Sequence, residues 1–192
     1  MKRVLAVLAL LVTAGGVSAQ NTDNSRIFKA GSGGVVILST VAEMMIATEM
    51  CGLGDRAEWQ KVVDAVDRRY RLCVGKDPTW SRLMDDFKEA AGKQATDSSG
   101  KSWGSFAIEV LLTTRGTEAG AMGAEKFCAR MPWKLALVPG AATEEAKAEY
   151  LKANPGAQLD NALRFFSYIR SLGADTGWTE ASCDKDFWPE FK

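Results

Sequence analysis

Four cysteines, Cys51, Cys73, Cys128 and Cys183, are the residues of this 192-residue chain best suited to covalent chemistry. No two of them are spaced as C-x-x-C, which argues against a thioredoxin-like redox site and against a zinc ribbon. An even number of cysteines in an exported protein is typical of disulfide bonds. We therefore expect two structural disulfides.

Four cysteines allow three pairings, and the helical pattern between them favours one. The segment 55–72 reads as one continuous helix, about 25 Å long at ~1.5 Å per residue, whereas bridged Cα atoms lie within about 7 Å of each other. A Cys51–Cys73 bridge is therefore the least favoured. If successive helices run up and down, Cys73 and Cys128 end on the same side of the bundle, which predicts the bridges Cys73–Cys128 and Cys51–Cys183.

The chain contains no histidine and has 24 basic and 24 acidic side chains. The lack of histidine excludes a His-based catalytic triad, a His-ligated zinc and a haem on a proximal histidine. The balanced charge offers no basic surface for nucleic acid. We expect no cofactor and no nucleic-acid partner.

Two acidic residues, Glu43 and Glu49, lie in an apolar segment that is expected to be helical. Burial raises the pKa of a carboxyl group, so Glu43 is a candidate general acid for a cell-wall or sugar-active enzyme. The two residues are six positions apart and do not share a helical face, so they cannot form a two-carboxylate glycosidase pair by themselves. This enzyme is kept as an alternative to the simpler interpretation, in which both side chains reach solvent.

A soft-metal carrier is a second alternative, because Met44, Met45 and Met50 lie beside Cys51. Thioether and thiolate sulfur atoms are the ligands that Cu(I) prefers. Methionines on an amphipathic helix are usually core residues, however, and an oxidised Cys51 offers no thiolate. Copper binding by these residues is therefore an alternative hypothesis.

Adjacent arginines near the end of the helix predicted over 55–72 could bind a phosphate or a carboxylate. Asp64 precedes Arg68 by four positions, and Asp67 precedes Arg71 by four, which is the spacing of intrahelical ion pairs. This spacing predicts a solvated face that neutralises itself. Arg69 has no such local partner and is the candidate binding residue.

Aromatic residues of the C-terminal tail form a further candidate binding feature. Trp178 and Trp188 lie on either side of Cys183, and Phe191 follows. We expect Trp188 and Phe191 to strap across the bundle while a bridge at Cys183 holds them. Alternatively, one or two of the six tryptophans line an open groove for a sugar, a peptide or a partner protein.

Residues 1–19 have the pattern of a secretory signal peptide. Lys2 and Arg3 precede a short apolar run, and Val17-Ser18-Ala19 supplies a small-x-small cleavage site. The run is shorter than the ~20 residues needed to cross a bilayer, so we expect cleavage after Ala19 and no membrane span afterwards. The predicted location is the periplasm or the extracellular space.

The remaining chain predicts an all-α fold. Residues 20–38 read as a flexible leader with a glycine-rich break and a short apolar entry into the first helix, and residues 39–192 as a single helical domain with an aromatic tail. Apolar residues at intervals of three and four predict helices over 39–51, 55–72, 78–91, 103–115, 117–131, 143–153 and 159–172, and the fourth and fifth of these could join. We expect an irregular or orthogonal bundle of six to seven helices, stapled by two disulfides.

These features predict a soluble, exported helical protein that acts by binding, such as an inhibitor, an immunity protein, an accessory protein or a chaperone-like protein. The expected partner is another exported protein or a component of the cell envelope. Enzymatic activity is not expected, because no set of nucleophile, base and orienting group can be assembled without histidine.

Overall fold

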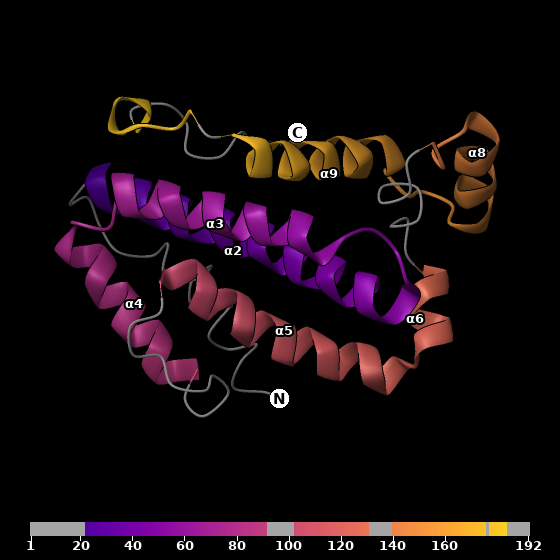
Figure 1. The fold of residues 1–192 in the computed structure, drawn as a ribbon, viewed down its shortest axis with the longest axis horizontal. Helices are drawn as coiled ribbons and strands as arrows, with labels where there is room; N and C mark the ends of the chain where they lie inside the picture. The colour runs from indigo at the N-terminus through magenta and orange to yellow at the C-terminus, as the bar shows by residue number, and fades with distance from the viewer. Residues whose placement is uncertain (1–21, 92–101, 131–139, 176, 184–192) are drawn as a thin grey trace.

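The computed structural model describes residues 22–91, 102–130, 140–175 and 177–183, which form a helical bundle (Figure 1). They comprise seven α-helices and one short 3-10 helix, Glu180–Ser182, and these described ranges contain no strand. The predicted all-α fold with six to seven helices is confirmed. The α-helices are α2 (Thr22–Cys51), α3 (Arg56–Cys73), α4 (Pro78–Ala91), α5 (Trp103–Met122), α6 (Ala124–Arg130), α8 (Glu144–Ala153) and α9 (Leu159–Ala174).

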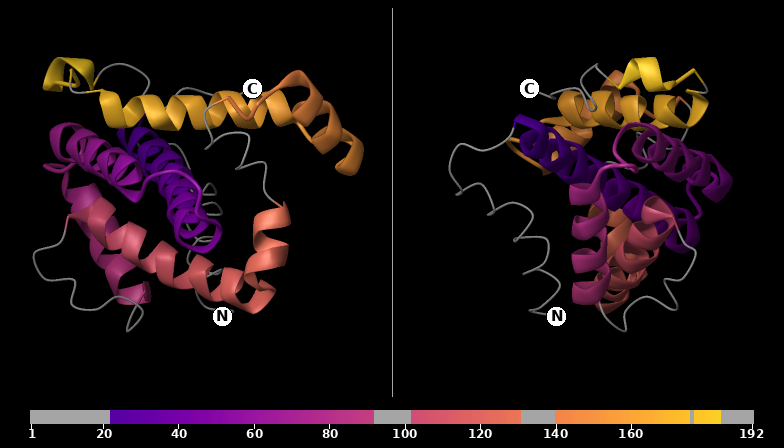
Figure 2. Two further views of the ribbon diagram at one scale, coloured as in Figure 1. Left: turned by 45° about the vertical axis from the view of Figure 1, so that its right-hand side comes forward. Right: turned by 90° about the vertical axis from the view of Figure 1, so that its left-hand side faces the viewer.

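Helix α3 lies at the centre of the bundle, between α2 and α5 on one side and α9 on the other (Figure 2). It begins as predicted, because the Asp55 carboxylate accepts a hydrogen bond from the backbone N–H of Ala57 at 2.8 Å. Residues at intervals of three and four are buried along its length, namely Trp59, Val62, Val63, Val66 and Tyr70. The periodicity of this segment therefore reports its burial correctly.

Helix α2 is longer than predicted, because it begins at Thr22. The prediction of a flexible leader over residues 20–38, and of a helix that begins at position 39, is wrong for the described part of that segment. Ile37 and Leu38 are buried in the core, and the burial of such side chains outweighs the low helix propensity of the preceding glycines.

Gly34 of α2 allows Tyr70 of α3 to approach. A Cβ atom at position 34 would overlap the Tyr70 hydroxyl and lie 2.7 Å from its Cζ. Gly34→Ala should therefore lower the free energy of unfolding by about 1–3 kcal/mol, since the added methyl overpacks the site. Chemical denaturation measures this change.

The matched control is Gly116→Ala in α5, where an added Cβ meets nothing within 4 Å. Because alanine has the higher helix propensity, this variant should be more stable by about 0.5–1 kcal/mol. Equal effects of the two substitutions would show that close packing does not explain Gly34.

The helix predicted over 103–115 continues across Gly116 to Met122 as α5, a joining that the prediction allowed, and the remainder of the helix predicted over 117–131 forms α6. Helix α5 ends at Gly123, whose φ of +83° favours glycine, and α6 begins at the next residue. Thr143 caps α8 as predicted, since its hydroxyl accepts a hydrogen bond from the N–H of Ala146 at 3.2 Å.

Two disulfides tie the bundle, and their pairing differs from the predicted one. Cys51 is bonded to Cys128 and Cys73 to Cys183. The predicted pairs Cys73–Cys128 and Cys51–Cys183 are therefore wrong. The physical reason is the direction of α5, which starts near the end of α3 and runs parallel to α2, so that α6 reaches the end of α2 (Figure 1).

The most apolar stretch of the described chain is Gly33–Cys51 in α2. By length and composition it could cross a membrane, and 56% of it is buried inside the bundle. Such burial is typical of a core helix, which packs here against α3 and α5. The predicted signal peptide, residues 1–19, lies outside the described residues, and the absence of a membrane span after its cleavage stays a prediction.

Candidate functional site

Two of the predicted binding residues, Arg69 and Trp178, come together where α3 meets the end of the described chain. The Arg69 side chain is only 8% exposed, and its Nη2 donates to Asp175 Oδ2 at 2.9 Å. Its Cζ lies 3.9 Å from the centroid of the Trp178 ring, which is a cation–π contact. The third predicted binding residue, Trp188, lies outside the described residues.

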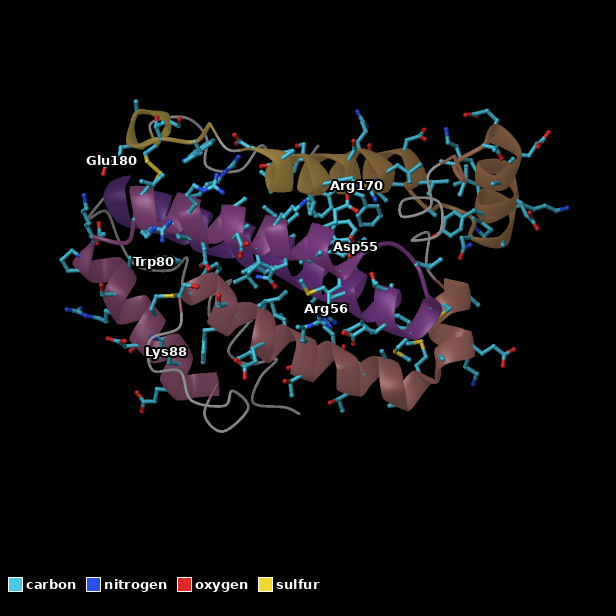
Figure 3. The ribbon with its side chains drawn as sticks, viewed as in Figure 1. Asp55, Arg56, Trp80, Lys88, Arg170 and Glu180 are labelled. Atoms are coloured by element: carbon cyan, nitrogen blue, oxygen red, sulfur yellow. A yellow bond between two sulfur atoms is a disulfide. The ribbon has the colours of Figure 1, made fainter. Side chains whose placement is uncertain are left out.

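Further contacts hold the segment after α9 against α3. We call Asp175 together with residues 177–183 the strap, and the region where it contacts α3 the tail junction. Arg68 Nη1 donates to the backbone carbonyl of Asp175 at 2.9 Å, and Trp178 Nε1 donates to Cys73 Sγ at 3.4 Å. The Cys73–Cys183 bond closes the junction covalently, next to Glu180 in Figure 3.

The predicted ion pairs within α3 do not form among the described residues. Asp64 accepts a hydrogen bond from Gln60 at 3.1 Å instead. Asp67 accepts hydrogen bonds from the N-terminus of α5, including the N–H of Gly104 at 2.6 Å. The prediction of a self-neutralised face is therefore wrong, because Asp67 bonds to α5 and Arg68 to Asp175. Asp64 and Arg71 are exposed, as predicted.

A tyrosine hydroxyl also belongs to the tail junction. Burial raises the pKa of Tyr168, and the nearby charge of Arg69 partly opposes this rise. The phenol therefore remains protonated at neutral pH. The junction thus combines a buried guanidinium, a carboxylate and two aromatic rings, a set that recognises and holds groups but contains no activated nucleophile.

Glu43 forms the second polar cluster, between α2 and α5. Its Oε1 lies 3.6 Å from Nε of Arg115, and Arg115 also pairs with Glu118 at 3.0 Å and donates to Ser39 Oγ at 3.3 Å. Burial raises the pKa of Glu43, while the Arg115 charge opposes this rise. No sequence signal links these helices, so Arg115 and Glu118 were not predicted.

Glu43→Gln should show which has the larger effect on stability, the burial of the Glu43 carboxylate or its attraction to Arg115. Because the folded state raises the Glu43 pKa above 4.5, its protonation stabilises the folded protein at low pH, and this contribution is lost as the pH rises through the raised pKa. The variant should therefore match the wild type near pH 4 and be more stable at pH 7, by up to about 1 kcal/mol. Urea denaturation at both pH values measures the difference.

A variant that is less stable than the wild type at pH 7 would contradict this expectation. It would mean that the attraction between Glu43 and Arg115 exceeds the cost of burying the carboxylate. Thr113→Val, at an exposed position in α5 close to Arg115, controls for effects of pH that do not involve Glu43.

The predicted soft-metal ligands are part of the core. Met44 and Met45 are buried, and Met50 packs against the same cluster. Cys51 is bonded to Cys128, so its sulfur is not a thiolate. Within the described ranges, no group of three or more His, Cys, Asp or Glu side chains could hold a metal ion.

Most of the described tryptophans are structural. Trp80 stacks on Tyr70 with ring centroids 4.6 Å apart, and Trp103 lies against both rings. Trp59 is buried beneath α9, where Arg170 lies 5.6 Å from its ring. Trp178 is the described tryptophan that is partly exposed, at the tail junction.

Among the described α-helices, α8 alone has no buried residue. It projects from the end of the bundle opposite the strap (Figures 1 and 3). Its Leu151 is 40% exposed, while the Thr143 cap and a Lys147–Glu144 pair at 2.7 Å support the helix locally. No feature of the sequence pattern distinguishes Leu151 from the other apolar residues.

Comparison of the chain with protein families, with curated proteins and with solved structures finds no match. The site geometry is therefore the basis for a function. It offers three features of different kinds: the tail junction, the Glu43–Arg115 cluster and the exposed helix α8.

Proposed function

We propose that this chain is an exported helical protein of the inhibitor, immunity, accessory or chaperone-like kind. It acts by binding another exported protein or a component of the cell envelope, and α8 is part of its contact surface. The observation that carries the proposal is a ten-residue helix with no buried residue and an exposed leucine.

Two disulfides support export to an oxidising compartment such as the periplasm. Bridges of this kind persist outside the cytoplasm and are rare within it. Cys51–Cys128 joins α2 to α6, and Cys73–Cys183 joins α3 to the strap. The apolar N-terminal sequence over residues 1–19 fits the same route.

The exposure of α8 supports binding. Isolated helices shorter than about 12–15 residues are marginal in water, and α8 gains little from the bundle because none of its residues is buried. A partner that covers Leu151 and the adjacent, half-buried Tyr150 would supply the missing apolar contact.

The experiment compares capture by three forms of the protein. Wild type, Leu151→Asp and Val36→Asp are each used to isolate partners from the native compartment, followed by mass spectrometry. Val36 is the matched control because, among the described side chains, it is the other large exposed apolar residue, 55% exposed, and it lies on α2. We expect one protein to be recovered with wild type and Val36→Asp and lost with Leu151→Asp.

The recovered protein is then titrated in purified form. Loss of a central apolar anchor of about 2 kcal/mol corresponds to a roughly 30-fold weaker Kd. Unchanged affinity of Leu151→Asp, or equal loss with Val36→Asp, would refute binding through α8.

A cell-wall or sugar-active enzyme is the second candidate, and the raised pKa of Glu43 favours it. Glu118 is a second carboxylate near Glu43, which Glu49 is not placed to be, although Arg115 pairs with both Glu43 and Glu118. Turnover on a panel of peptidoglycans and oligosaccharides tests this candidate. Activity that disappears in Glu43→Gln would support it, and activity that persists in that variant would remove Glu43 as the acid.

A further inference from the structure

The tail junction resembles a ligand site that is filled from within the molecule. We propose that Arg68 and Arg69 form a binding site for an acidic and aromatic peptide segment, that the strap occupies this site as an internal ligand, and that reduction of Cys73–Cys183 by a dithiol opens it. This inference goes beyond the proposed function, because the junction and α8 lie at opposite ends of the bundle (Figure 1).

The two arginines and the cysteine that contact the strap come from the last turns of α3. Arg69 binds the Asp175 carboxylate at its edge and the Trp178 ring on its face, and Arg68 binds the Asp175 carbonyl. A guanidinium binds a carboxylate through the N–H groups along its edge and an aromatic ring through its planar face. The ligand chemistry is therefore a carboxylate followed closely by an aromatic ring.

Stability alone does not account for a buried arginine at this position. Replacing a buried ion pair by apolar residues of similar volume is often neutral or stabilising. The Arg69 side chain is 8% exposed, and the residue that neutralises it, Asp175, is the C-cap of α9, where the strap begins. A buried arginine at this position is accounted for if the site binds an acidic group reversibly.

Apart from Asp175 and Trp178, the strap is held mainly by its covalent bond. Gly177, Thr179, Glu180 and Ala181 are exposed, and the burial of the strap is concentrated at Cys183. The Lys76–Glu180 pair at 3.2 Å is also exposed and contributes little. Breaking the Cys73–Cys183 bond therefore leaves the Arg69 contacts to hold the strap in competition with other acidic segments.

Opening is a two-electron thiol–disulfide exchange. A thiolate of the dithiol attacks one bridge sulfur and forms a mixed disulfide, while the other sulfur leaves as a thiolate and takes up a proton. The second thiol of the reductant then displaces the cysteine that remains. The products are two cysteine thiols and the oxidised dithiol. The N–H that Trp178 donates to Cys73 Sγ favours Cys73 as the leaving thiolate.

The test uses the full chain and a peptide with the strap sequence. An open variant carries Cys73→Ser, Trp178→Ala and Cys183→Ser and keeps Asp175, so Arg69 stays paired before peptide is added. The probe is a fluorescein-labelled peptide of residues 174–182, followed by fluorescence anisotropy. We expect saturable binding to the open variant and none to the oxidised wild type.

Matched changes on both sides define the site. Replacing the aspartate of the peptide by asparagine, or its tryptophan by alanine, should weaken binding at least tenfold. Arg69→Lys in the open variant should do the same, because lysine provides neither the planar edge nor the stacking face. A variant with Cys73→Ser and Cys183→Ser alone should bind more weakly than the open variant, since its intact strap competes.

Two results would overturn the proposal. One is the absence of saturation at millimolar peptide with an open variant whose circular dichroism is helical, and the other is equal binding of the asparagine peptide. If the open variant does not fold, the variant with the two serines alone decides, by whether it binds the asparagine peptide as tightly as the unchanged peptide. Gel filtration of that variant shows whether the bound segment comes from the same chain or from a second copy. A dimer that dissociates when peptide is added indicates the strap of a second copy.

Discussion

Replacing Cys73 and Cys183 together by serine should lower the free energy of unfolding by about 4–5 kcal/mol, and replacing Cys51 and Cys128 together should have a similar effect. The bridges span 110 and 77 residues, and chain entropy depends only weakly on such a difference in loop length. Because a domain is stable by about 5–15 kcal/mol, each change removes a large share of the total. Urea denaturation at neutral pH measures both.

Peptide mapping without reductant provides the control for these variants. The wild type should give one cross-linked peptide containing Cys51 with Cys128 and another containing Cys73 with Cys183. Recovery of Cys51 with Cys183 would contradict the observed arrangement of the helices. A pair of serine variants that are as stable as the wild type would show that the denatured chain is not constrained by the bridges.

Asp175→Asn should lower the free energy of unfolding by about 2–3 kcal/mol, because it leaves the buried Arg69 without its carboxylate. This value is at the lower end for a broken buried pair, since the Asp175 side chain is 35% exposed and Trp178 continues to cover the guanidinium. Thermal and chemical denaturation measure the loss.

A double-mutant cycle tests the cause of that loss. Adding Arg69→Met to Asp175→Asn removes the uncompensated charge while keeping a long side chain at the position. The double variant should recover to within about 1 kcal/mol of the wild type. If both variants are equally unstable, packing at the junction, and not the unpaired charge, explains the effect of Asp175.

Local signals in the sequence were sufficient for several elements. Asp55 and Thr143 cap α3 and α8 as predicted, and Pro78 opens α4. These features depend on hydrogen bonds and backbone preferences within a few residues, which a sequence displays directly. The all-α class was predicted from apolar residues at intervals of three and four. The start of α2 was not predicted, because the burial of Ile37 and Leu38 is a tertiary effect.

Long-range geometry was not predictable from the chain. Arg69 finds its carboxylate 106 positions away at Asp175, and Glu43 meets an arginine of another helix at Arg115. Neither contact has a spacing that identifies it. The disulfide pairing failed for the same reason, since it depends on whether α5 runs parallel or antiparallel to α2, a choice that hydrophobic patterns leave open.

The order of the two bridges along the chain constrains how the protein matures. The bonds interleave, because Cys73 lies between Cys51 and Cys128, and Cys128 lies before Cys183. On the proposed export route, the first two thiols to leave a translocon are therefore ones that never join in the finished molecule. Correct maturation requires α3 to form early enough to keep them apart, or an isomerase to reshuffle them afterwards.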